Sequence, residues 1–302
     1  MTRDTNKILL IVLLFLGITS CIDDSKENKS TLNGASINTN DVQNLNISFL
    51  LDLSDRIDPE KYPNPSMEYF LRDVEYIKSV SEAFYTHLKR KKVRQMNDKI
   101  QMYFDPEPRN QNINSISEDL RFNVSRQNAS LELLDEIKEF YAEKPIKIYE
   151  LAIKDDKYVG SDTWRFFKTK VNDFCIEDGY RNILVILSDG YIYHKDTKIR
   201  QDNQTTYLTP QDIRAFKLDT NNWDEKMSTE NYGFIPAAEN LDNLEILVLG
   251  INPDTKNDFE EDVIMSYWSN WFNEMKVKRY EIKTAGLPSD MDKIIKDFIL
   301  NK

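Results

Sequence analysis

The sequence has few of the residues that build metal clusters or covalent cross-links. Its 302 residues include two cysteines, Cys21 and Cys175, and two histidines, His87 and His194. Two histidines far apart in the sequence do not favour a zinc site. Glycine is scarce, with 8 residues, and a single long apolar run is present. These absences leave hydroxyl and carboxylate oxygens as the main candidates for site chemistry.

The apolar run lies near the start of the chain. Residues 8–18, ILLIVLLFLGI, follow Arg3 and Lys7 and are too few to span a bilayer. A basic start and a short apolar run before small residues are typical of an export signal. The next residues, Thr19-Ser20-Cys21, resemble the lipobox of bacterial lipoproteins. We therefore predict a lipoprotein signal peptide over residues 1–20 and acylation, with palmitate for example, at Cys21; an ordinary signal peptide or an uncleaved membrane helix is the alternative.

A polar segment over residues 21–44 follows the predicted acylation site. It has too few apolar residues to form a core, which predicts a flexible tether. Its acidic start, IDDSKEN, is similar to the export tags of some lipoproteins of Bacteroidetes-type bacteria. We expect a bacterial cell-envelope protein, lipid-anchored at the outer membrane on its periplasmic or its surface face. Each buried acyl methylene contributes about 0.8 kcal/mol to membrane binding.

Charge and length limit the remaining part of the chain. Acidic residues number 51 and basic residues 40, and the formal net charge is −11. An acidic surface excludes nucleic acid as the expected partner and favours cations or basic protein faces. With Cys21 acylated, Cys175 has no disulfide partner and is expected to be a small core residue. Residues 45–302 suffice for one domain that a hydrophobic core stabilises.

Short apolar runs alternate with longer stretches of helical periodicity in this domain. The pattern predicts an α/β fold, a doubly wound, mostly parallel six-stranded central sheet flanked by helices. The predicted strands are 45–53, 99–104, 147–153, 182–187, 244–251 and 279–284. The predicted helices are 66–92, 130–143, 164–177, 259–276 and 289–300, and Trp268 and Trp271 are expected to pack on the sheet.

The segment over residues 191–242 is far longer than a usual connection between two strands. It mixes aromatic and polar residues, as in YIYHKD and TNNWDEKMSTENYGFIP. It begins directly after the fourth predicted strand. We expect an insertion that forms a cap beside the functional site and sets partner specificity.

Three polar groups stand where ligands bind in open α/β sheets, beyond the carboxyl ends of strands. Asp52-Leu53-Ser54-Asp55-Arg56 follows the first strand, Gly160-Ser161-Asp162-Thr163 precedes a helix, and Ser188-Asp189-Gly190 follows the fourth strand. Each group alone is also typical of a turn or a helix cap. Their order on this strand pattern is what indicates a shared site.

Together these groups resemble the metal-ion-dependent adhesion site of von Willebrand factor type A domains, a resemblance that extends over residues 45–302. In that family a DxSxS motif, a threonine and an aspartate hold the ion. Asp52 and Ser54 match the first two positions, Ser161 stands at the threonine's place, and Asp189 at the aspartate's. The resemblance implies a Mg²⁺ or Ca²⁺ ion bound by these four residues, which takes a carboxylate from a protein partner in a vacant position.

One position departs from the family pattern. Arg56 stands where the family has its second serine, and a guanidinium cannot ligate a metal. Three arrangements are open: Asp55 replaces the serine as ligand, Arg56 turns toward solvent, or Arg56 pairs with Asp52 or Asp189 in a metal-free polar lock. The further candidate site residues are Asp55, Arg56, Asp162 and Thr163.

The residues favour a binding or adhesion module over an enzyme. No set of nucleophile, base and orienting residue can be assembled from the sequence. A metal-free scaffold lipoprotein in an envelope assembly is one alternative, which Arg56 favours. A metal-dependent phosphoester hydrolase with Asp52 as nucleophile or ligand is another, although such enzymes usually carry a second aspartate where Ser54 stands.

Overall fold

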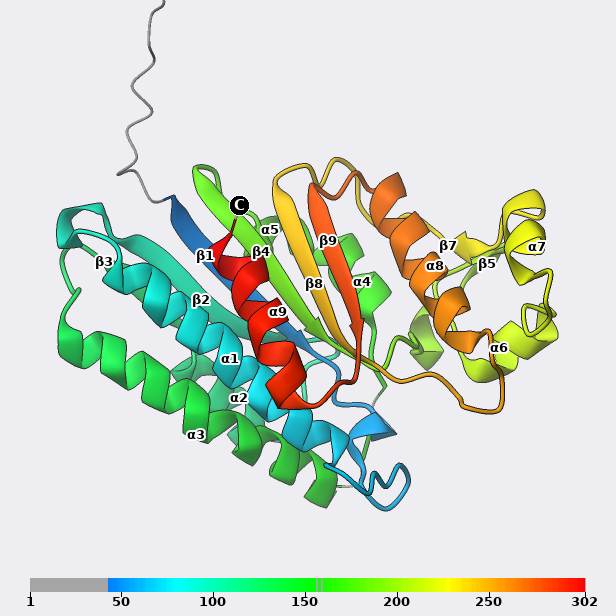
Figure 1. Ribbon diagram of the computed structural model, residues 1–302, viewed down its shortest axis with the longest axis horizontal. Coiled ribbons are helices and arrows are strands. Elements are labelled where there is room, and N and C mark those ends of the chain that lie inside the picture. Colours follow the sequence, from blue (N-terminus) through cyan, green and yellow to red (C-terminus); the bar gives the residue numbers. More distant parts are fainter. Residues whose placement is uncertain (1–42, 156, 159, 302) are drawn as a thin grey trace, which may run out of the picture. The chain divides into compact units, whose positions relative to one another are not determined.

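The computed structural model describes residues 43–155, 157–158 and 160–301 and is built around a six-stranded sheet in the order β3-β2-β1-β4-β8-β9 (Figure 1). The strands are β1 Asn44–Leu51, β2 Asn97–Phe104, β3 Phe122–Ser125, β4 Tyr180–Leu187, β8 Leu244–Ile251 and β9 Arg279–Thr284. Only β3 is antiparallel to its neighbour. This order is that of a doubly wound α/β sheet and confirms the predicted fold class, a mostly parallel six-stranded sheet flanked by helices.

Helices cover both faces of the sheet, so the central strands are buried on both sides (Figure 1). One face carries α1 Tyr69–Lys89, α2 Gln111–Asp119, α3 Leu131–Asp155 and α9 Pro288–Leu300. The other carries α4 Thr163–Thr169, α5 Val171–Cys175 and α8 Glu260–Glu274. Because side chains alternate along a strand, Phe49 packs in the first core and Leu50 in the second.

The predicted third strand at 147–153 is wrong. These residues form the second half of α3, which continues through Pro145. The buried side chains Leu134, Ile137, Tyr141, Ile148 and Tyr149 recur at helical spacing against the core. Burial of this stripe outweighs the cost of a proline inside a helix. The sixth strand of the sheet is instead β3, a short edge strand.

The predicted helix over 164–177 is divided. Helix α4 ends at Thr169, and α5 begins at Val171. Lys170 between them has φ −128°, outside the helical region. Cys175 at the end of α5 is buried, which confirms its prediction as a core residue.

The insertion forms a small sheet of its own. It contains β5 Arg200–Gln201, β6 Gln204–Thr205, β7 Gly233–Phe234, α6 Pro210–Ala215 and α7 Trp223–Thr229. Three 3-10 turns complete the described elements: η1 Asp55–Ile57, η2 Val93–Gln95 and η3 Lys195–Thr197. The ring of Phe234 packs on α8, with its centroid 5.1 Å from the ring centroid of Tyr267 and 5.3 Å from that of Trp271. Trp268 and Trp271 are both fully buried, as predicted.

The membrane predictions concern another part of the chain. The signal peptide, Cys21 and the tether up to residue 42 lie outside the described residues. Within the described ranges, no helix has the length and hydropathy needed to cross a membrane.

Candidate functional site

A cleft of about 700 Å³ lies at the carboxyl ends of β1 and β4 and is lined by all four residues of the predicted cation site. Strands β1 and β4 pair in parallel, with Leu51 opposite Leu187. Asp52 and Asp189 therefore follow neighbouring strands, and the amide of Asp52 donates to the carbonyl of Leu187 at 3.0 Å. The sheet register places these two carboxylates at one rim.

The third segment is fixed to this rim by the insertion. Ser161 forms an isolated antiparallel bridge with Tyr193. Gly160 has φ +81°, and a Cβ there would lie 2.6 Å from the carbonyl oxygen of Tyr193, so the close approach requires glycine. The hydroxyl of Ser161 lies 3.3 Å from that of Thr163. Ser161 thus lines the cleft although it comes from neither strand end.

Several oxygens of the site remain available for a ligand. Asp52 Oδ1 accepts from the amide of Ser54 at 2.8 Å, and Oδ2 accepts from the Ser188 hydroxyl at 3.3 Å. Asp189 Oδ1 accepts from the amide of Tyr191 at 3.0 Å. In the described ranges, neither Asp189 Oδ2 nor the Ser54 hydroxyl makes a hydrogen bond. The donor set therefore offers hard oxygen ligands from hydroxyls and carboxylates.

Arg56 points inward and pairs with two carboxylates. Its Nη2 donates to Asp73 Oδ2 at 2.6 Å and to the carbonyl of Leu187 at 3.0 Å. Its Nε donates to the carbonyl of Asp52 at 3.2 Å and lies 3.6 Å from Asp52 Oδ2. Of the three open arrangements, pairing with Asp52 is found, and the one in which Arg56 turns toward solvent is wrong, because the side chain is buried.

Asp73 on α1 is the residue that the sequence interpretation missed. It is 1 % exposed and also accepts from the Tyr149 hydroxyl at 3.1 Å. The sequence does contain an indication of its role. Asp73 stands between Phe70 and Ile77 on the apolar face of α1, and a carboxylate buried there requires a polar partner.

The carboxylates at the rim are only partly neutralised. Burial and the negative charge of Asp52 raise the pKa of Asp189 to about 7, against the opposing effect of Arg56. Burial likewise raises the pKa of Asp73, although Arg56 and Tyr149 act against it. The pKa of Arg56 is raised because its two carboxylate partners outweigh its burial. A further cation near Asp52 and Asp189 would relieve their repulsion.

The other candidate residues have different surroundings. Asp55 lines the cleft and pairs with Lys61 at 3.5 Å. Asp162 does not line it: its carboxylate caps α4 by accepting from the amide of Arg165 at 3.0 Å, and it also accepts from the Thr197 hydroxyl at 2.7 Å. Thr163 is buried beside Ser161 and likewise does not line the cleft.

The histidines take no part in a metal cluster. His87 Nε2 lies 3.0 Å from Asp98 Oδ1, and His194 Nδ1 lies 3.5 Å from Asp162 Oδ2. Among the described residues, no group of three or more His, Cys, Asp and Glu side chains is arranged to hold a metal. A cation in the cleft therefore depends on the hydroxyl oxygens of Ser54 and Ser161.

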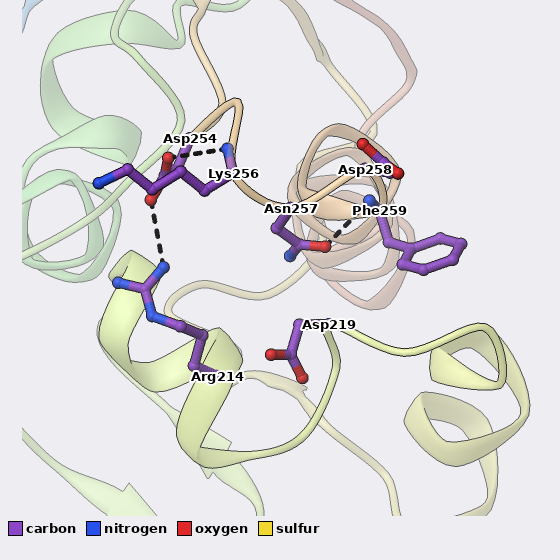
Figure 2. Close-up of a pocket in the computed structure, with 7 residues that line it drawn as sticks. All are labelled: Arg214, Asp219, Asp254, Lys256, Asn257, Asp258 and Phe259. Carbon is purple, nitrogen blue, oxygen red and sulfur yellow. Dashed lines mark hydrogen bonds and ion pairs between the residues drawn. The ribbon is translucent and has the colours of Figure 1, made fainter.

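A second cavity of about 380 Å³ adjoins the cleft, and Figure 2 shows its lining residues. Arg214 on α6 and Asp254 after β8 line both cavities and pair at 3.2 Å. Tyr193, Pro210 and Gln211 also line the main cleft. The insertion thus forms one wall of the cleft and is joined to the sheet rim by an ion pair.

Comparisons with known proteins support no family assignment. No family model matches the chain, and no curated protein matches it in sequence. Among solved structures, an aerotolerance-related membrane protein from Bacteroides fragilis is similar at 11% identity over 85% of this chain and 100% of that one, with a TM-score of 0.37. The conserved hypothetical protein BatB from Bacteroides thetaiotaomicron is also 11% identical over 85% of this chain and 97% of its own, with a TM-score of 0.37.

A pilus adhesin, SpaC from Lactobacillus rhamnosus, is similar as well. It is 10% identical, and the similarity covers 86% of this chain and 31% of the adhesin, with a TM-score of 0.41. Similarity of this degree carries no information on function. The strand order and the residues that line the cleft are therefore the observations that bear on function.

Proposed function

We propose that this protein is a binding module that engages a protein partner through a divalent cation at the carboxyl rim of its sheet. The observation that carries this proposal is that Asp52, Ser54, Ser161 and Asp189, from three distant segments, line one cleft. Such convergence of hydroxyl and carboxylate oxygens suits Mg²⁺, with Ca²⁺ as the second choice.

The residues present fit such an ion. Ser54 and Ser161 would supply neutral hydroxyl oxygens, and Asp52 and Asp189 the negative charge. A bound ion with few carboxylate ligands would supply an electrophilic position for a carboxylate of the partner. Arg56 neutralises part of the charge of Asp52, so we expect weaker cation binding than two unpaired aspartates would give.

Titration of the mature chain from Cys21 onward, purified in detergent, tests the cation site. Calorimetry with MgCl₂ and CaCl₂ is expected to show one site in the wild type and none in Asp189→Ala. Asp178→Ala is the matched control, because this exposed carboxylate lies just before the amino end of β4, at the opposite end of the strand from Asp189. Equal heats in all three proteins, or none in the wild type, would refute the cation site.

The buried pair of Arg56 with Asp52 favours a second candidate, a metal-free scaffold protein in an envelope assembly. In that case Arg56 is the only cation that the site needs. If the wild type shows no heat of cation binding and still binds its partner in EDTA, the scaffold is supported and the cation-dependent module is excluded.

We also propose that the protein is a lipoprotein held in the bacterial envelope through Cys21. The support is the lipobox-like sequence before this residue and the polar segment after it. Metabolic labelling with an alkyne palmitate analogue and membrane fractionation test this. We expect labelling and membrane association in the wild type and neither in Cys21→Ala; a membrane-bound, labelled Cys21→Ala protein would disprove the anchor.

A further inference from the structure

The segment from Tyr193 to Arg200, here the 193–200 strip, lies beside the cleft and carries unpaired positive charge. Its backbone is joined to the candidate site by the bridge between Ser161 and Tyr193. The strip contains three cations, Lys195, Lys198 and Arg200, and one carboxylate, Asp196, so its formal charge is +2 in a chain whose net charge is −11. All three are exposed.

These cations have no acidic partners within the described part of the chain. Lys198 Nζ lies over the rings of Tyr207 at 4.4 Å and Tyr193 at 5.5 Å. Arg200 donates to the carbonyl of Asp202 at 2.7 Å and lies over the ring of Phe216 at 5.0 Å. Cations without an acidic partner of their own are available to a carboxylate of another molecule, and charge complementarity of this kind steers association.

Apolar surface accompanies this charge. Tyr193 and Ile199 are each 44% exposed, and few large apolar side chains of the described residues are as exposed. Of the two, Tyr193 also lines the cleft. Aromatic side chains and arginine are enriched at the centre of protein interfaces, whereas lysine is depleted there and belongs to the polar rim.

We propose that the 193–200 strip binds an acidic segment of the partner protein that also presents apolar side chains. This rests on the proposed function in one respect: a carboxylate of the same segment reaches the cation at Asp52 and Asp189, while neighbouring carboxylates contact Lys195 and Lys198. A protein segment is favoured over a membrane surface because the strip adjoins a cleft, whereas lipid headgroups need no cavity beside them.

Binding of a defined peptide tests the proposal. The probe is a fluorescein-labelled octapeptide of six glutamates and two phenylalanines, measured by anisotropy with the mature chain in MgCl₂. The test variant is Lys195→Glu/Lys198→Glu. The matched control is Lys138→Glu/Lys147→Glu, which makes the same charge change at exposed positions of α3, on the other face of the sheet. We expect about tenfold weaker binding in the test variant and no change in the control.

The outcomes separate the strip from the cation site. Equal binding by both double variants, absence of wild-type binding, or equal binding of a peptide with lysines in place of the glutamates would overturn the proposal. Binding of phosphatidylserine vesicles in preference to the peptide would also overturn it. Peptide binding that persists in EDTA and is weakened in the test variant, in a protein that gives no heat with Mg²⁺, would support the 193–200 strip as a docking surface and refute the cation site. Heat of Mg²⁺ binding in a protein that does not bind the peptide would support the cation site and refute the docking surface.

Discussion

Replacement of Arg56 by alanine should strongly destabilise the protein. Its guanidinium is buried and lies 2.6 Å from Asp73, whose side chain is also buried. Among the described residues, the substitution leaves the buried Asp73 carboxylate with the Tyr149 hydroxyl as its only hydrogen-bond partner. Removing one member of a buried ion pair typically costs about 3 to 5 kcal/mol.

Urea denaturation at pH 7 measures this cost, with the fluorescence of the buried Trp268 and Trp271 as the signal. For a domain of this size we expect the midpoint of Arg56→Ala to fall by about 1 to 2 M. Asp73→Asn in the Arg56→Ala background should recover part of the loss, because the orphaned charge is then removed.

Arg126→Ala is the control, since Arg126 is exposed and forms no ion pair among the described residues. Its expected effect lies within about 0.5 kcal/mol. A cost for Arg56→Ala below about 1 kcal/mol, the size of an exposed pair, would contradict the inward orientation of Arg56. If the costs of Arg56→Ala and Asp73→Asn simply added in the double variant, this would contradict the pairing of Arg56 with Asp73.

Three further predictions concern pH, the insertion and catalysis. The pKa of Asp189 is raised from 3.8 to about 7 in the folded state, so between these pH values the folded protein holds a proton that the unfolded chain has lost. Without divalent cations, the free energy of unfolding should therefore fall as the pH rises through this interval. Asp189→Asn should flatten the slope in urea titrations, and an unchanged slope would exclude Asp189 as its source. Phe234→Ala should cost about 3 to 5 kcal/mol and expose the insertion to limited proteolysis, because Phe234 is 1% exposed and packs on α8; unchanged cleavage would contradict this docking. If the protein is a binding module, it should not hydrolyse p-nitrophenyl phosphate in MgCl₂; turnover that Asp52→Asn abolishes would favour the phosphoester hydrolase instead.

Local patterns predicted much of the sheet. Strands β8 and β9 begin and end at the predicted residues, and β1 and β4 differ by a few positions. The largely apolar run of β8 is bounded by Asn243 and Asn252, and β9 alternates polar and apolar residues, as a strand does. At 147–153 a competing pattern did exist, because a proline normally ends a helix, whereas the apolar spacing of α3 continues across Pro145.

The candidate site was accessible to sequence reasoning only in part. The polar residues after β1 and β4 were recognised because strand ends are where ligands bind. Their shared cleft depends on the parallel pairing of these strands and on the bridge from Ser161 to Tyr193.

The sequence alone determined the kind of chemistry available: oxygen ligands, an acidic surface and a layered α/β core follow from composition and periodicity. The partner of Arg56 was decided only by tertiary structure. Asp73 lies 17 positions away on a helix that covers the sheet. A buried guanidinium pairs with the carboxylate that packing brings within hydrogen-bond distance. Residue type limits which interactions can form, whereas the distances that select among them arise only when strands and helices pack.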